Sequence, residues 1–139
     1  MTNRLIQFFE EHTYLLYLTL ATLTIITISL TLLPSDQITN HSLLHYDKIG
    51  HALMFGSWTF FLGLLLLVSG QRPLPLFSIF LAGSFFGISV EVLQGVLPSD
   101  RNMDLYDVFA DLAGCLLAIL LLKILLQRLN SVQDTAHNM

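Results

Sequence analysis

The sequence has few charged residues for its length. Lys, Arg, Asp and Glu make up 12% of its 139 residues, whereas 54% are hydrophobic. A soluble domain usually carries about a quarter charged residues, so this shortage excludes a water-exposed surface over most of the chain. The mean hydropathy of +0.69 agrees with this. We therefore expect lipid to be the main solvent of the chain.

Other features are scarce or missing. The single cysteine, Cys115, excludes an internal disulfide, and its Leu and Ala neighbours favour a free thiol in apolar surroundings. The six Lys and Arg residues form no basic patch, which excludes a nucleic-acid partner. The sequence has no P-loop, GxGxxG, EF-hand or CxxC motif. We predict no nucleic-acid partner, no cofactor and no dedicated metal site.

Four long apolar runs are present instead. They cover residues 14–33, 49–68, 74–97 and 105–126. About 20 apolar residues in a helix cross a hydrocarbon core of ~30 Å. Backbone groups in lipid must be hydrogen-bonded within their own segment, which predicts helices. The predicted fold class is an all-α membrane protein, an antiparallel bundle of four transmembrane helices forming a single domain over residues 1–139.

The first run follows Arg4, so a signal peptide has to be considered. The apolar part of a signal peptide is usually about 7–15 residues long and ends at a small-residue cleavage site. This run is longer and ends at Leu33 and Pro34 without such a site. We interpret it as a retained helix, with Leu5–Phe9 lying at the membrane interface before it.

The orientation of the bundle follows from the Lys and Arg residues that flank the runs. With four spans, both termini lie on one side of the membrane. That side carries Arg4, Arg72, Lys123 and Arg128. The opposite side carries only Lys48 and Arg101. Because cytoplasmic flanks are enriched in Lys and Arg, both termini are predicted to be cytoplasmic in a multi-pass protein.

Ionisable side chains gather at one side of the predicted bundle. They are Asp47, Lys48, His51, Glu91, Arg101, Asp107 and Asp111. They belong to the start of the second run, the end of the third and the start of the fourth. These three ends share one side in an antiparallel bundle, and the charge bias places that side outside the cytoplasm.

Glycine spacing in the third run indicates where Glu91 points. Gly83, Gly87, Glu91 and Gly95 recur every four residues. Such a stripe lets membrane helices approach closely. Glu91 is therefore predicted to face the interior of the bundle, with Gln94 beside it.

Three aspartates form a column at the start of the fourth run. Asp104, Asp107 and Asp111 share one helical face. Asp111 lies about 10 Å deeper than Asp104, inside the hydrocarbon boundary. An unpaired carboxylate there costs at least ~2.5 kcal/mol. Lys48, His51 and Arg101 are the available partners.

A structural role is the alternative for each of these side chains. An aspartate near a helix N-terminus is stabilised by the helix dipole, which would explain Asp47, Asp104 and Asp107. His51 could bond to a backbone carbonyl, and Glu91 and Asp111 could lock the helices through an internal ion pair. Convergence of the side chains within a few Å would favour a site.

Three motifs resemble the VanZ-like membrane protein family. They are Asp47-Lys48-Ile49-Gly50-His51, Glu91-Val92-Leu93-Gln94, and Arg101 followed by Asp107, Asp111 and Gly114. The family pattern is Asp-Lys-x-x-His, Glu-x-x-Gln, and Arg followed by Asp-x-x-x-Asn-x-x-Gly. The resemblance spans residues 47–122. Asp111 departs from it, because a carboxylate replaces the usual amide.

The resemblance implies a four-span protein of the bacterial plasma membrane. The family's named member is associated with resistance to the glycopeptide antibiotic teicoplanin. A non-enzymatic role in the cell envelope is the first hypothesis that follows. The polar cluster would bind membrane lipid, a lipid-linked cell-wall intermediate or a lipoglycopeptide, with Lys48 and Arg101 contacting phosphate.

Two other hypotheses remain open. In an intramembrane enzyme acting on a phospholipid or polyprenyl phosphate head group, His51 would be a general base oriented by Asp47, with Glu91 as the acid. Asp107, Asp111, Glu91 and His51 could also hold a divalent cation such as magnesium or calcium. In a proton-coupled transporter, Glu91 and Asp111 would form a relay, and so thin a bundle would need to form a homo-oligomer.

Overall fold

The computed structural model describes residues 2–32, 47–70, 73–97 and 103–137. Five helices form in these segments. They are α1 (Thr2–Glu11), α2 (Thr13–Leu32), α3 (Asp47–Val68), α4 (Leu76–Val96) and α5 (Leu105–His137). The last four are long and apolar enough to cross a membrane. No strand occurs in the described segments, and the predicted all-α membrane bundle is confirmed.

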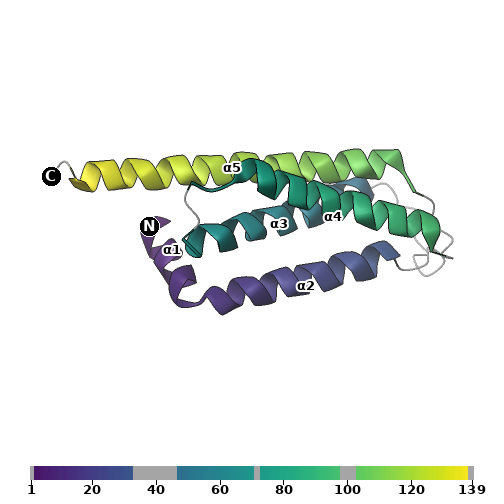
Figure 1. The fold of residues 1–139 in the computed structure, drawn as a ribbon, viewed down its shortest axis with the longest axis horizontal. Coiled ribbons are helices and arrows are strands. Elements are labelled where there is room, and N and C mark those ends of the chain that lie inside the picture. Colours follow the sequence, from purple (N-terminus) through teal and green to yellow (C-terminus); the bar gives the residue numbers. More distant parts are fainter. Residues whose placement is uncertain (1, 33–46, 71–72, 98–102, 138–139) are drawn as a thin grey trace.

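The four long helices run along a common axis, with both chain termini at the same end (Figure 1). Helix α3 contacts each of the other four helices, most extensively α5. The start of α3, the end of α4 and the start of α5 therefore meet at the end opposite the termini (Figure 1). This is the grouping of helix ends that the sequence predicts.

Several helix bounds differ from the predicted spans by one or two residues, and the end of α5 differs by more. Helix α4 begins at Leu76 rather than residue 74, because the residue before Pro75 is disfavoured in a helical conformation. Helix α5 continues to His137 rather than ending at residue 126. No Gly or Pro follows Gly114, so nothing in the polar tail breaks the helix.

Apolar side chains fill the bundle in two clusters. The larger one lies toward the termini and contains Ile6, Leu16, Leu64, Leu65, Leu67, Leu74, Ile79, Leu122 and Leu129. The smaller one consists of Phe55, Val90 and Cys115. Cys115 is a buried free thiol, as predicted. The ring of Phe55 stacks on His51 at a centroid distance of 6.0 Å, so the small cluster lies directly under the polar end of the bundle.

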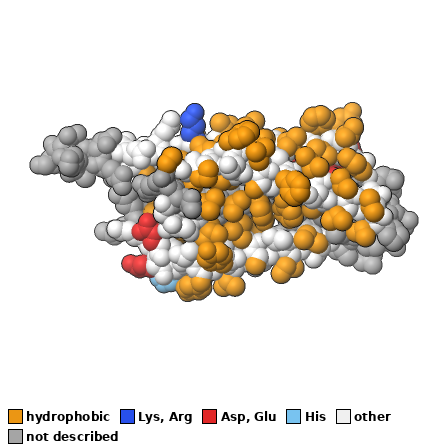
Figure 2. Space-filling model, in the orientation of Figure 1, with side chains coloured by type: hydrophobic (Ala, Val, Ile, Leu, Met, Phe, Trp, Pro, Cys, Tyr) orange, Lys and Arg blue, Asp and Glu red, His pale blue; other side chains and the backbone are white. Residues whose placement is uncertain are grey.

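The outer surface of the bundle is apolar. Phe77 and Phe85 on α4 are 73% and 74% exposed. In Figure 2, hydrophobic side chains cover most of the length of the visible face, and charged ones lie toward its ends. An apolar surface of this extent suits lipid and not water.

Small residues bring α3 and α5 into close backbone contact. A Cβ atom added to Gly56 would lie 2.9 Å from the carbonyl oxygen of Gly114. A Cβ atom on Gly114 would contact the backbone of Ala52, with its carbonyl carbon 2.8 Å away. Contacts this short exclude any side chain at the two glycines. This crossing sets the rotation of α5 against α3 and thereby places the polar side chains above it.

Candidate functional site

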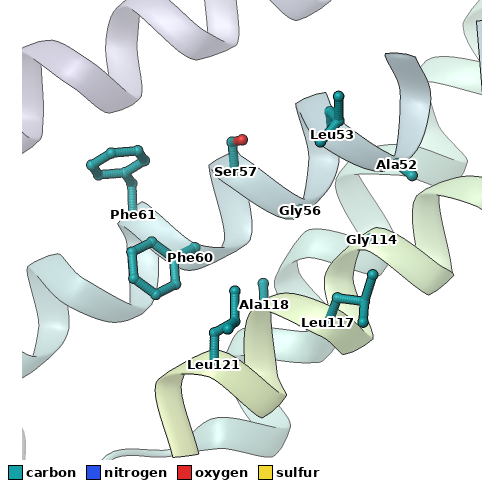
Figure 3. Close-up of a pocket in the computed structure, with 10 residues that line it drawn as sticks. All are labelled: Ala52, Leu53, Gly56, Ser57, Phe60, Phe61, Gly114, Leu117, Ala118 and Leu121. Carbon is teal, nitrogen blue, oxygen red and sulfur yellow. The ribbon is translucent and has the colours of Figure 1, made fainter. Parts of the chain in front are cut away.

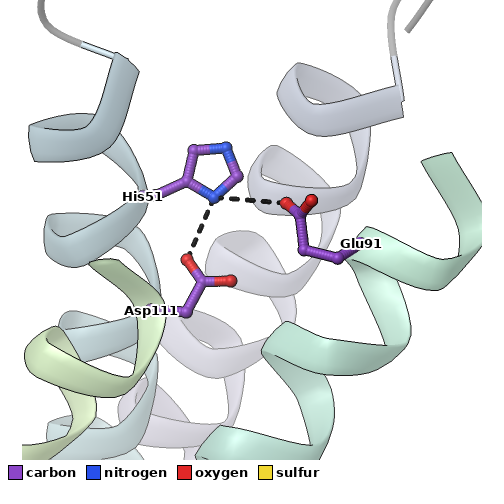
Figure 4. A group of neighbouring side chains, drawn as sticks. All are labelled: His51, Glu91 and Asp111. Atoms are coloured by element: carbon purple, nitrogen blue, oxygen red, sulfur yellow. Dashed lines mark hydrogen bonds and ion pairs between the residues drawn. The ribbon is translucent and has the colours of Figure 1, made fainter. Parts of the chain in front are cut away.

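Three buried side chains from three helices converge at the polar end of the bundle. The Nδ1 atom of His51 on α3 lies 3.0 Å from Oδ1 of Asp111 on α5. The same nitrogen lies 3.6 Å from Oε1 of Glu91 on α4. Figure 4 shows both carboxylates pointing toward the imidazole ring. We refer to His51, Glu91 and Asp111 as the His51 cluster.

The glycine stripe of α4 makes room for this cluster. Gly83, Gly87 and Glu91 are buried, as the stripe predicts, whereas Gly95 is exposed. A Cβ atom on Gly87 would lie 2.9 Å from Oδ2 of Asp111. Gly87 is therefore the residue that allows the Asp111 carboxylate to lie between α4 and α5.

Two carboxylate oxygens of the His51 cluster are buried and accept no hydrogen bond within the described part of the chain. They are Oε1 of Glu91 and Oδ2 of Asp111. The Glu91 and Asp111 residues are 0% and 1% exposed. A buried polar atom without a partner costs about 1–3 kcal/mol, and more when it is charged. These two oxygen atoms are therefore available to bind a proton, a cation or a hydrogen-bond donor.

Lys48 is bound by two further carboxylates nearer the helix end. Its Nζ atom lies 2.8 Å from Oδ1 of Asp107 and 3.1 Å from Oδ2 of Asp104. The same atom lies 5.5 Å from the centre of the Tyr106 ring, within reach of a cation–π contact. We refer to Lys48, Asp104 and Asp107 as the Lys48 cluster.

Asp104 caps the N-terminus of α5. Its Oδ1 atom accepts the backbone N–H of Tyr106 at 2.8 Å, and its own N–H donates to Oε2 of Glu91 at 3.3 Å. The Tyr106 N–H and the Lys48 ammonium lower the pKa of the Asp104 carboxyl below its ordinary value. Asp104 therefore links the Lys48 cluster to the His51 cluster.

We predict that Asp104→Asn makes the stability of the chain fall less steeply as the pH is lowered. Because its pKa is lowered in the folded chain, ionised Asp104 stabilises the fold above its unfolded-state pKa, and this contribution is lost as the pH falls through the folded-state pKa. Asparagine keeps the cap and removes only the charge. Thermal unfolding in detergent between about pH 6 and about pH 3 should show a shallower decline for the variant. Identical declines would contradict this.

The structure places the other predicted residues as follows. Gln94 is buried on the same face of α4 as Glu91. Asp107 is buried but pairs with Lys48 rather than with His51. Arg101 and the side chain of Asp47 lie outside the described residues. The carboxylate that orients His51 among the described side chains is Asp111.

An open apolar groove runs between α3 and α5 (Figure 3). Its volume is about 310 Å³. It is lined by Ala52, Leu53, Gly56, Ser57, Phe60, Phe61, Gly114, Leu117, Ala118 and Leu121. This groove was not predicted from the sequence. The available signal was the four-residue spacing of Ala52 and Gly56 and of Gly114 and Ala118.

Comparison with known proteins adds the family. The family model described as VanZ/LLP1 matches residues 4–126, which is most of the chain. Comparison with the curated proteins and with the solved structures gives no match. The matched range covers α2, α3 and α4 in full, most of α5, and both clusters. The chain belongs to the VanZ/LLP1 family.

Proposed function

We propose that the chain is a multi-pass protein of the bacterial plasma membrane that binds an amphiphilic ligand at the outer end of its bundle. Both termini would lie in the cytoplasm. The polar head of the ligand would lie at the His51 and Lys48 clusters, and its acyl chain would lie in the α3–α5 groove. A lipid-linked cell-wall intermediate or a lipoglycopeptide such as teicoplanin has both parts.

The position of the groove beside the polar end carries this proposal. Ala52, at one end of the groove, follows His51 directly, and Gly114 is less than one turn beyond Asp111. Along α3 the groove extends to Phe61, which is about 13 Å at 1.5 Å per residue. The groove is lined by neighbours of the cluster residues along α3 and α5, and by none of the cluster residues themselves. A polar helix end next to an apolar groove fits an amphiphile better than a water-soluble ligand.

The charge of the two clusters limits how a phosphate could bind. Four carboxylates surround one lysine and one histidine among these side chains. Lys48 has three N–H donors, and Asp104 and Asp107 use two of them. One donor remains for a phosphate oxygen. An anionic head group would therefore need further positive charge, from Arg101 or from a bound cation.

We expect variants that fill the groove to bind the lipid ligand more weakly. Leu117→Trp places a large side chain in the groove, whereas Leu116→Trp changes the adjacent exposed residue, which does not line it. Native mass spectrometry of the detergent-purified chain with a polyprenyl phosphate should show about tenfold weaker retention for Leu117→Trp, since excluding two CH₂ groups costs about 1.6 kcal/mol.

The same pair of variants tests the cellular role. Expression of the natural chain or of Leu116→Trp in a teicoplanin-sensitive bacterium should raise the inhibitory concentration of teicoplanin. Expression of Leu117→Trp should raise it less. Equal lipid retention by the two variants, together with no change in teicoplanin sensitivity, would overturn the proposal.

An intramembrane enzyme is the second candidate function, favoured by the pairing of His51 with Asp111. The 3.0 Å contact orients the imidazole through Nδ1, and Figure 4 shows the other ring nitrogen on the side away from Asp111. A histidine held in this way can take a proton from water that attacks a phosphate ester. Release of phosphate from a phospholipid panel, abolished by His51→Gln, would support it. Inertness toward the panel would remove it.

A further inference from the structure

We propose that His51, Glu91 and Asp111 bind a divalent transition-metal ion. This inference goes beyond the proposed function, because the metal site needs no lipid and stands on the geometry of the His51 cluster alone. A bound cation would also supply positive charge for a phosphate head group. Only that consequence rests on the proposed function.

The spacing of the three side chains suits a metal. Each offers one ligand atom, and the three atoms lie within 4.8 Å of one another. Nδ1 of His51 is 3.0 Å from Oδ1 of Asp111 and 3.6 Å from Oε1 of Glu91. Donor atoms bound about 2.0–2.2 Å from one metal ion lie roughly 3.0–3.5 Å apart. The three side chains already point toward one another in Figure 4, and small rotations would bring all three atoms to ligand distance.

The two buried carboxylate oxygens that accept no hydrogen bond from the described residues are a second, independent indication of a bound metal ion. Oε1 of Glu91 and Oδ2 of Asp111 are buried and accept no hydrogen bond from the described residues. The other oxygen of Glu91 accepts the Asp104 N–H, which orients this carboxylate as second-sphere bonds orient metal ligands. The other oxygen of Asp111 lies 3.0 Å from Nδ1 of His51, and metal binding to Nδ1 would replace this contact.

Charge balance favours a divalent ion over a proton on His51. Two carboxylates and a neutral imidazole carry two negative charges, which a divalent ion neutralises. A protonated imidazole would leave one negative charge in a site that is almost fully buried, and uncompensated charge there is costly. One imidazole with two carboxylates suits Zn²⁺ or Mn²⁺ better than Ca²⁺, which prefers oxygen ligands alone.

Metal binding can be measured on the full-length chain in detergent without any lipid ligand. The chain is stripped with a chelator, titrated with ZnCl₂ or MnCl₂, and separated from free metal before elemental analysis. We expect about one ion per chain. His51→Gln and Asp111→Asn should each weaken binding about 100-fold or more, because each removes a direct ligand. His12→Gln changes a remote histidine and should leave the affinity unchanged.

A second measurement distinguishes a loss of metal binding from a folding defect. The metal should raise the thermal unfolding temperature of the natural chain and of His12→Gln, and should not raise that of Asp111→Asn. Asp111→Asn keeps the size of the side chain beside Gly87, so it is expected to fold. Failure of the natural chain to retain metal, or equal retention by His51→Gln and Asp111→Asn, would overturn the site. Neither outcome depends on whether lipid binds.

Discussion

Replacing His51 with leucine is expected to lower the free energy of unfolding by about 3–5 kcal/mol. His51 is 1% exposed, and its Nδ1 atom lies 3.0 Å from Asp111 and 3.6 Å from Glu91, the two buried carboxylates of its cluster. Leucine fills a similar volume, so the loss reflects the removed polar partner and not a cavity. The measurement is unfolding in detergent by a denaturant, in the presence of a chelator so that bound metal does not contribute.

A double variant separates the loss of the partner from other effects. When Asp111→Asn is added to His51→Leu, the buried carboxylate that lost its partner becomes a neutral amide. The double variant should therefore be more stable than His51→Leu alone, which is the sign of direct coupling between contacting residues. A loss below about 1 kcal/mol for His51→Leu, or additive losses in the double variant, would show that the pair does not stabilise the fold.

The helices of the bundle could be predicted because lipid leaves few alternatives. Apolar runs of about 20 residues must form helices in hydrocarbon, and turn residues such as Pro34 mark the breaks. The extension of α5 to His137 could not be inferred from hydropathy. It depends on the absence of helix breakers in a polar segment, which does not need to cross the membrane.

The burial of Glu91 could also be predicted, whereas its partners could not. The glycine stripe gives the face of α4 that packs inward, and this follows from spacing within one helix. The pairing of His51 with Asp111 depends on the rotation of α5 against α3, which the contact between Gly56 and Gly114 fixes. The spacing of small residues shows which face of each helix packs, but not which residues of two helices meet.

The partners of Lys48 also could not be predicted from the sequence. The aspartate column placed three carboxylates on one face of the fourth run, and sequence alone left Lys48 free to pair with any of them. In the structure it binds Asp104 and Asp107, and the deeper Asp111 binds His51. The division follows depth, because Lys48 precedes His51 by nearly one turn and so lies closer to the helix end.

Replacing Gly114 with alanine is expected to destabilise the bundle by about 1–3 kcal/mol, through overpacking of the α3–α5 crossing. The new Cβ atom would contact the backbone of Ala52, with the carbonyl carbon 2.8 Å away. Backbone on both sides cannot move aside as a flexible side chain can, so α3 and α5 must separate along much of their contact. The separation would also move Asp111 away from His51.

Gly50 provides the matched control for this prediction. A Cβ atom added to Gly50 on α3 has nothing within 4 Å among the described residues. Gly50→Ala is therefore expected to stabilise the helix by about 0.4–1 kcal/mol, because alanine loses less backbone entropy on folding. Opposite signs for the two glycine-to-alanine changes, measured by thermal unfolding in detergent, would identify the crossing as the contact that positions the His51 cluster. A neutral Gly114→Ala would show that α3 and α5 pack less closely than this geometry requires.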